Sequence, residues 1–359
     1  MKKMKLVVSD LHLGKGRILE GGALNSLEEF YYAEKFVEFI NYYMSGEYRD
    51  YQIELILNGD IFNFLQCDYR GHFLTVLTEG VTLSVMKAIV KGHPQFFNAL
   101  KEFAAREGNQ VTYVVGNHDQ GMFWPACRNY LDEVIGKKIK YRNIVYFFDG
   151  VHIEHGHMYE AANRLDPKRF FLKKDLPEPI LNLPLGSHFF VDFVLKVKNN
   201  YPYVDKIRPF SKMLRWALFS ETMFFLKGVV QLILYFASIL FFRDPRRQVT
   251  VRKVVEVLLE SAVFPDLSEQ AKKILMDERV HTCIFGHTHV YQYRQWGNDM
   301  EYFNTGTWTE LTSLDMPSLG KITKLTYVMV EYPDDGSRPR GRLKEWRGYH
   351  RIEEDVVIA

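Results

Sequence analysis

The stretch VTYVVGNHD, residues 111–119, joins a short apolar run to a cluster of polar residues. An apolar run of this length is typical of a buried strand. The same arrangement occurs twice before this stretch, in MKLVVSDLH (residues 4–12) and IELILNGD (residues 53–60). It occurs twice after it, in VHIEHGH (residues 151–157) and HTCIFGHTH (residues 281–289). The chain therefore repeats a strand followed by a polar cluster five times.

The segments between these runs carry helical patterns. Residues 27–44 and 95–105 have apolar side chains near the spacing of an amphipathic helix. Strands that alternate with helices predict an α/β fold. In open α/β sheets, ligands bind beyond the carboxyl ends of the strands, where all five polar clusters would lie. Clusters that are far apart in the sequence can therefore meet at one edge.

The composition limits the class of protein. The chain has 359 residues, of which 47% are apolar and 15% aromatic, so it can bury a large core. A formal net charge of +2 gives no indication of a nucleic-acid partner, and we expect none. Only three apolar residues in a row precede Asp10, too few for a secretory signal, so we expect a cytoplasmic protein. The cysteines show neither disulfide nor zinc-ribbon spacing; they are Cys67, Cys127 and Cys283.

Residues 161–253 break the alternation and are rich in proline, aromatic and basic residues. Within them, Thr222–Phe242 is apolar enough that a transmembrane helix must be considered. A span there would put residues 287–289 across the membrane from the other clusters and destroy a shared site. Two interpretations stay open: a lid or interfacial helix on the inner surface of the membrane, and a buried core helix. Polar residues recur along one face of this helix, namely Lys227, Gln231, Tyr235 and Ser238.

The polar clusters contain aspartate, histidine and asparagine side chains that can bind metal ions. Three clusters carry pairs separated by one residue, whose side chains point the same way at an extended strand end. These pairs are Asp10 with His12, His155 with His157, and His287 with His289. The other two clusters contribute Asp60 after Gly59, and Asn117 with His118 after Gly116.

Imidazole and hard oxygen donors without thiolate suit manganese, iron, zinc or nickel better than calcium. More than four such donors indicate two ions. Two ions can bind a bridging hydroxide and clamp the oxygens of a phosphoryl group. The residues alone therefore predict a two-metal hydrolase.

The series DLH, GD, GNHD, HGH and GHTH, in this order and each after an apolar strand, resembles the calcineurin-like metallophosphoesterases. The resemblance covers residues 1–159 and 280–309. It implies a β-sandwich flanked by helices, with residues 1–160 and 254–359 as the core and residues 161–253 as a helical cap or lid. It also implies a phosphoester substrate and two divalent ions, for which we expect manganese ahead of iron, zinc or nickel.

The resemblance further implies a role for each residue. Asp10, His12 and His289 would bind the first ion, Asp60 would bridge both ions, and Asn117, His155 and His287 would complete the second site. His118 would act at the leaving-group oxygen as general acid or transition-state stabiliser, oriented by Asp119. His157 would be an outer or substrate-facing group, because the second residue of its pair varies in the family.

The expected substrate class comes from a narrower resemblance. DLHLG (residues 10–14) and GDIFNF (residues 59–64) resemble the branch with UDP-2,3-diacylglucosamine pyrophosphatases, lipid A enzymes that carry a helical lid at the same place. This favours a lipid-linked phosphoester whose acyl chains contact the apolar helix. His118 departs from that branch, in which arginine is expected, and the insertion is long. The alternatives are a soluble phosphatase or phosphodiesterase, a nuclease that uses basic clusters of the insertion, and a non-enzymatic scaffold.

Overall fold

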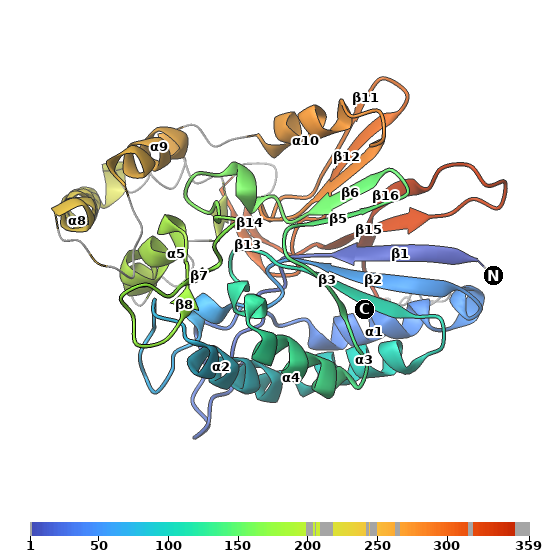
Figure 1. The fold of residues 1–359 in the computed structure, drawn as a ribbon, viewed down its shortest axis with the longest axis horizontal. Coiled ribbons are helices and arrows are strands. Elements are labelled where there is room, and N and C mark those ends of the chain that lie inside the picture. Colours follow the sequence, from blue (N-terminus) through green and yellow to red (C-terminus); the bar gives the residue numbers. More distant parts are fainter. Residues whose placement is uncertain are drawn as a thin grey trace, which may run out of the picture.

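The computed structural model describes residues 2–198, 204, 206–208, 218–241, 244, 250–262, 266–314 and 319–348. Two β-sheets face each other in the middle of the molecule, and helices cover the outer face of each sheet (Figure 1). The expected β-sandwich flanked by helices is therefore confirmed.

The first sheet contains three of the five predicted strands as direct neighbours. Its order is β16-β15-β1-β2-β3-β4, in which β1 to β4 are parallel and β15 and β16 run antiparallel to their neighbours. Its strands are β1 (Lys3–Val8), β2 (Gln52–Asn58), β3 (Gln110–Val114), β4 (Lys140–Arg142), β15 (Leu325–Glu331) and β16 (Arg340–Trp346). Because β1, β2 and β3 are parallel, the polar clusters that follow them lie at the same edge.

The second sheet contains the other two predicted strands. Its order is β11-β12-β10-β6-β5, and β10 is parallel to both β6 and β12. Its strands are β5 (Val145–Phe148), β6 (Val151–Glu154), β10 (Thr282–Phe285), β11 (Gln292–Trp296) and β12 (Met300–Asn304). The polar clusters after β6 and β10 are therefore neighbours as well.

A buried apolar cluster joins the two sheets. Val7, Ile56 and Val114 from the first sheet pack in one cluster with Ile153 and Ile284 from the second. Burial of such side chains contributes roughly 1.5–3 kcal/mol each to stability. Because all five lie on strands that precede a polar cluster, this packing also brings the two groups of clusters together.

Five helices cover the sandwich. Helices α1 to α4 pack on the first sheet and α10 packs on the second (Figure 1). They are α1 (Ala33–Tyr43), α2 (Glu79–Gly92), α3 (Pro94–Ala105), α4 (Pro125–Ile135) and α10 (Leu267–Leu275). Short 3-10 turns lie between the elements of the core, namely η1 (Gly46–Tyr48), η2 (Phe64–Gln66), η3 (Gln120–Phe123) and η4 (His157–Tyr159).

The helix predicted for residues 27–44 begins only at Ala33. The reason is Glu28, whose buried carboxylate accepts hydrogen bonds from the backbone N–H groups of Gly14, Gly16 and Phe30. These bonds hold the residues before the helix in a turn around the loop that follows β1. A side chain that bonds backbone donors in this way competes with helix formation.

The insertion forms a layer at one end of the sandwich (Figure 1). Its described elements are β7 (Phe171–Leu172), β8 (Ile180–Leu181), α5 (Leu185–Phe189), a π-helical turn (Phe190–Val194), α6 (Leu195–Lys198), β9 (Ile207–Arg208), α8 (Thr222–Phe241) and α9 (Val251–Ala262). Strand β9 pairs with β13 (Leu311–Ser313), which also pairs with β14 (Gly320–Ile322). This small sheet ties the insertion to the core.

Helix α8 is exposed along most of its length. Tyr235 and Phe236 pack on Phe189 of α5 and form its inward side. On the opposite side, Leu234 and Phe241 are 63% and 83% exposed. The interpretation of this segment as a buried core helix is therefore wrong. Tyr235, which the sequence placed on the polar face, instead faces the molecule.

Helix α8 lies at the outer edge of the molecule, beside α9 and α5 (Figure 1). Within the described part of the chain, no helix combines the length and the apolar character that a membrane span requires. Phe242, the last residue of the predicted apolar helix, lies outside the described residues.

Candidate metal centre

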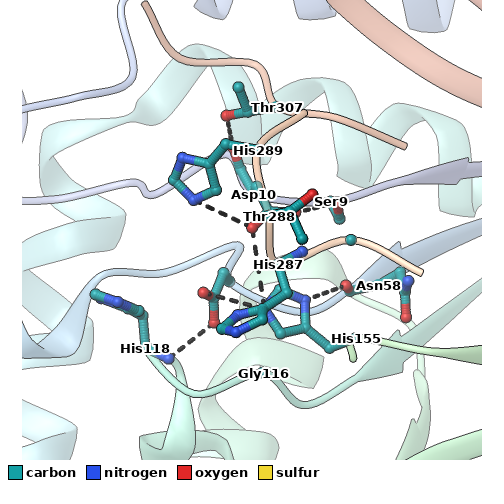
Figure 2. Close-up of polar contacts among 12 residues, drawn as sticks. Ser9, Asp10, Asn58, Gly116, His118, His155, His287, Thr288, His289 and Thr307 are labelled. Atoms are coloured by element: carbon teal, nitrogen blue, oxygen red, sulfur yellow. Dashed lines mark hydrogen bonds and ion pairs between the residues drawn. The ribbon is translucent and has the colours of Figure 1, made fainter. Parts of the chain in front are cut away.

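The seven predicted metal ligands come together where the carboxyl ends of strands from both sheets meet. The first sheet contributes Asp10, His12, Asp60 and Asn117, and the second contributes His155, His287 and His289. In Figure 2, Asp10 lies between His289 on one side and His155 and His287 on the other. Five of the seven residues are buried, and the other two, His287 and His289, are half-buried.

Asp10, His12 and His289 form a first group of donors. Asp10 Oδ1 is 3.3 Å from His289 Nε2 and 3.9 Å from His12 Nε2, and the two Nε2 atoms are 3.0 Å apart. Bonds from metal ions to nitrogen and oxygen are about 2 Å long. Atoms spaced in this way can therefore share one ion, as the sequence predicts for the first site.

Asp60, His155 and His287 form a second group, whose donor atoms lie within 4.8 Å of one another. His155 Nε2 is 3.1 Å from Asp60 Oδ2, and the same oxygen is 3.9 Å from His12 Nε2 of the first group. Asp60 thus lies between the two groups, where a bridging carboxylate is expected. Asn117 lines the same cavity.

Two ligand histidines have outer partners that sequence analysis did not find. His155 Nδ1 is 2.9 Å from the carbonyl oxygen of Asn58, and His287 Nε2 is 2.8 Å from Glu160 Oε2. Each contact uses one ring nitrogen and leaves the other for an ion. Burial opposes ionisation of Glu160, but the His287 ring lowers the pKa of this carboxyl group to about 2. Glu160 follows His157 by three residues. This spacing indicates a contact with the site only once the turn η4 is known.

Several buried oxygen and nitrogen atoms of the site lack a hydrogen-bond partner among the described residues. Among the described residues, Asp10 Oδ1, Asn117 Oδ1 and His155 Nε2 make no hydrogen bond. A buried polar atom without a partner costs about 1–3 kcal/mol. Divalent ions would satisfy these atoms, and the donors are the imidazole nitrogens and hard oxygens that such ions bind. The residues present therefore fit the two ions that the family implies.

Five of the ligand residues have a left-handed backbone. Their φ angles are 54° at Asp10, 53° at His12, 51° at Asp60, 72° at His287 and 61° at His289. The other described non-glycine residues of this kind are Arg70, Asp149 and Asp175. This conformation costs of order 1 kcal/mol or more for each residue and is concentrated at functional sites. The extended strand end predicted for Asp10 with His12, and for His287 with His289, is therefore wrong, although these side chains reach the same site.

Neighbouring loops hold this strained backbone in place. The Asp10 N–H donates to the Gly59 carbonyl oxygen at 3.1 Å, and the His12 N–H donates to the Asp60 carbonyl oxygen at 2.9 Å. The loops after β1 and β2 therefore fix each other.

His118 lies beside the centre, but Asn63 orients its ring. His118 Nδ1 is 3.0 Å from Asn63 Oδ1, and the ring meets Phe190 of the insertion edge-on with centroids 5.3 Å apart. Burial lowers the pKa of His118 to about 3, which favours the neutral form of the ring. The expected orientation by Asp119 is therefore wrong.

Asp119 instead braces the loop that carries Asn117 and His118. Its buried carboxylate accepts hydrogen bonds from the Gly116 N–H, the Tyr113 hydroxyl and the Ile61 N–H at 2.5, 2.5 and 3.0 Å. Burial, followed by the charge of Asp60, raises the pKa of Asp119 to about 7. Asp119 thus joins the loops after β2 and β3.

His157 is buried behind the ligand histidines. Its ring centroid lies 5.5 Å from that of His155 and 6.4 Å from that of His287, and neither ring nitrogen bonds a described residue. Burial, followed by the two neighbouring rings, keeps the pKa of His157 well below its usual value. His157 does not belong to the described residues that line the cavity, which agrees with an outer position.

The centre opens into a cavity of about 220 Å³. One wall consists of ligand residues and His118, and the insertion supplies much of another wall with Gly186, Ser187, Phe190 and Lys206. Helix α8 contributes no described residue to this lining. The part of the insertion that closes over the centre is therefore α5 with the turn that follows it.

The sequence profile described as calcineurin-like phosphoesterase matches residues 5–291. No curated protein matches the chain.

Solved structures show remote likeness. A dimetal phosphatase from Danio rerio has 12% identity and a TM-score of 0.33, over 96% of this chain and 98% of that one. A conserved uncharacterized protein from Streptococcus pneumoniae, described as a predicted phosphoesterase, has 11% identity and a TM-score of 0.32, over 98% and 94%. Zinc-bound Vps29 from Entamoeba histolytica has 10% identity and a TM-score of 0.24, over 96% and 99%. At these values the three structures say nothing about the substrate of this chain.

Proposed function

The chain belongs to the calcineurin-like phosphoesterase family and is a phosphoester hydrolase, and from this premise we propose that it uses two divalent ions to hydrolyse a lipid-linked phosphoester. The main support for a two-ion centre is Asp60, whose Oδ2 lies 3.1 Å from His155 Nε2 and 3.9 Å from His12 Nε2. A carboxylate between two groups of histidines is suited to bridge two ions.

Each ion has its own set of proposed ligands. The first ion would be held by Asp10, His12 and His289, the second by Asn117, His155 and His287, and both by Asp60. When bound, the ions would activate a water molecule and withdraw negative charge from the phosphoryl oxygens. Manganese is the ion we propose ahead of iron, zinc or nickel, and imidazole, carboxylate and amide oxygen donors without thiolate are compatible with it.

His118 is the proposed proton donor to the leaving-group oxygen. Its ring lines the cavity and is held between Asn63 and Phe190. A bound phosphoryl group is anionic and would raise the pKa of His118, because a nearby negative charge favours the imidazolium form. The protonated ring could then transfer its proton as the phosphoester bond breaks.

The proposed lipid substrate is supported by the apolar side of α8. Met223, Leu226, Ile233, Leu234 and Phe241 are all exposed. Large exposed apolar surfaces mark sites that contact lipids, ligands or partner proteins. Through Tyr235 and Phe236, α8 packs on Phe189, and the next residue, Phe190, lines the metal cavity. An acyl chain on α8 would thus lie next to the element that covers the centre.

The proposed domain division is that of the sequence pattern. We assign residues 1–160 and 254–359 to the core and residues 161–253 to the insertion. Val254 of α9 shares a small apolar cluster with Leu185 of α5 and Ile239 of α8, so α9 crosses this boundary and packs with the insertion.

Chelation followed by manganese is the direct test of the hydrolase centre. Protein freed of metal with a chelator should show only background hydrolysis of bis(p-nitrophenyl) phosphate, and Mn²⁺ should restore the rate. Rates are measured from released nitrophenol, with buffer plus Mn²⁺ as the blank. If fully metallated protein leaves a broad panel of phosphoesters intact, the scaffold alternative replaces the enzyme.

The lipid proposal predicts that substitutions on α8 reduce activity toward an acylated substrate selectively. Leu234→Glu with Phe241→Glu should weaken liposome binding and hydrolysis of an acylated substrate, because charge opposes burial in an apolar environment. Hydrolysis of a small phosphoester should persist, since α8 does not line the cavity. Liposome binding is measured by sedimentation, and hydrolysis rates are measured for the acylated substrate and for the small phosphoester.

Gln231→Glu is the control, because it adds one negative charge, half that of the double variant, at an exposed polar position of α8. It should leave both activities close to those of the unaltered protein. A double variant that retains liposome binding and the acylated-substrate rate would favour the soluble phosphatase or phosphodiesterase alternative.

A further inference from the structure

The outward nitrogen of the His12 ring faces a carboxylate across a gap. His12 Nε2 points into the centre and lies 3.9 Å from both Asp10 Oδ1 and Asp60 Oδ2. His12 Nδ1 is buried and makes no hydrogen bond with any residue that the structure describes. Glu29 Oε2 lies 3.9 Å from this Nδ1. This separation is about 1 Å longer than a hydrogen bond.

The other oxygen of Glu29 is held by the insertion. Glu29 Oε1 is 3.1 Å from Lys198 Nζ and 3.6 Å from Lys206 Nζ. Lys198 is almost fully buried and also donates to Gln66 Oε1 at 2.7 Å. Two ammonium groups of the insertion therefore converge on one buried carboxylate of the core, and that carboxylate lines the metal cavity.

The backbone of the insertion fixes both lysines. Lys198 is the last residue of α6, and Lys206 directly precedes β9. The Lys206 carbonyl oxygen accepts a hydrogen bond from the Thr312 N–H at 3.0 Å, next to the pairing of β9 with β13. Their positions at the end of a helix and at a strand make Glu29 a defined point of contact between the insertion and the core.

We propose that Glu29 is a positioning residue for the first ion. It accepts the Nδ1 proton of His12 and so fixes the ring form that presents Nε2 to the metal. His155 and His287 already have outer partners of this kind, a carbonyl oxygen and a carboxylate. Outer partners of metal-bound histidines set the orientation and the basicity of the ring. This inference depends on the two-ion centre proposed above.

In this proposal, Glu29 Oε2 moves about 1 Å toward His12 Nδ1 while Oε1 stays near Lys198. A carboxylate has two oxygens, so one can accept from His12 while the other stays with the ammonium groups. The insertion thus contacts the same carboxylate through Lys198 and Lys206.

The test measures manganese binding with the second site weakened. Asn117→Ala removes a ligand of the second site, so in a titration of this variant with Mn²⁺, followed by electron paramagnetic resonance, the first site is the tighter of the two. In this background, Glu29→Gln should weaken binding by about 10- to 100-fold. Lys198→Met, the matched control, removes an ion pair of Glu29 but leaves its carboxylate beside His12, so the loss should be smaller. Equal losses would mean that Glu29 acts only by anchoring the insertion, and would overturn the proposal.

A second measurement separates positioning from folding. In zinc-loaded protein labelled with ¹⁵N-histidine, the Nδ1–H resonance of His12 should shift in Glu29→Gln and stay in place in Lys198→Met. If Glu29→Gln does not fold, Glu29→Asp keeps the charge for the lysines, draws the carboxylate back from His12, and should also weaken the first site. If a folded Glu29 variant binds Mn²⁺ with unaltered affinity, the role of Glu29 is overturned and the two-ion centre is not. Failure of the unaltered protein to bind Mn²⁺ overturns the two-ion centre itself.

Discussion

Replacement of Asp60 by asparagine is expected to remove most of the bound metal and to slow hydrolysis by more than about 100-fold, since even outer partners of metal ligands contribute 10- to 100-fold. Asp60 lies between the two donor groups, so each ion would lose a charged ligand. The fold should persist, because asparagine tolerates the left-handed backbone that Asp60 adopts. Metal content after dialysis, measured by mass spectrometry, and initial rates with added Mn²⁺ give the two quantities.

Asp277→Asn is the control for this change, because Asp277 pairs with Arg279 at the surface, away from the centre. It removes the same charge and should alter neither metal content nor rate. An Asp60→Asn protein that retains two ions per chain and the full rate would exclude Asp60 as the shared ligand.

Replacement of His118 by alanine is expected to slow hydrolysis by roughly 10²–10⁴-fold, the usual contribution of a proton donor. Both ions should stay bound, because the two proposed ligand sets do not include His118. The loss should be larger for an alkyl phosphoester than for a nitrophenyl ester, since a poor leaving group depends more on protonation. Rates for the two substrates and the metal content of the same preparation measure these effects.

Asn63→Ala tests the orientation of the His118 ring while the ring itself stays in place, because Asn63 Oδ1 contacts His118 Nδ1 at 3.0 Å. It should reduce the rate less than His118→Ala and show the same preference for good leaving groups. Metal loss as large in His118→Ala as in Asp60→Asn would contradict the assigned roles, and so would an equal loss of rate on both ester types.

The strands and the collection of donors could be predicted from the sequence because the signals are local. Each polar cluster follows directly on an apolar run, as at Asp60 after β2 and Asn117 after β3. Glycines such as Gly116 stand where a side chain would collide with a neighbouring loop, in this case with Asp60. Parallel pairing of the strands then brings distant clusters to one edge.

The outer partners could not be predicted, because they depend on distances across the fold. Glu29, Asn63 and Glu160 have no special spacing from the residues they face, and each reaches the centre through the course of a turn or loop. The role first assigned to Asp119 fails for a related reason. In a tight turn, adjacent side chains point in different directions, so Asp119 faces the loop after β2 while His118 faces the cavity.

The inward side of α8 was also beyond the reach of the sequence pattern. Tyr235 and Ser238 have the polar character of a solvent-facing stripe, but Tyr235 is amphipathic and places its ring on Phe189. Only the packing of α5 determines which side of such an apolar helix becomes the contact side.

The left-handed backbone of five residues lowers the stability of the chain at positions that its activity would need. These residues are Asp10, His12, Asp60, His287 and His289. Glycine at any of these positions would relax the backbone, yet would also remove a proposed metal ligand. Selection for heat resistance alone should therefore change these residues early and yield a more robust but inactive protein. An active enzyme would have to keep these side chains although they oppose the conformational preferences of the polypeptide at the same five positions.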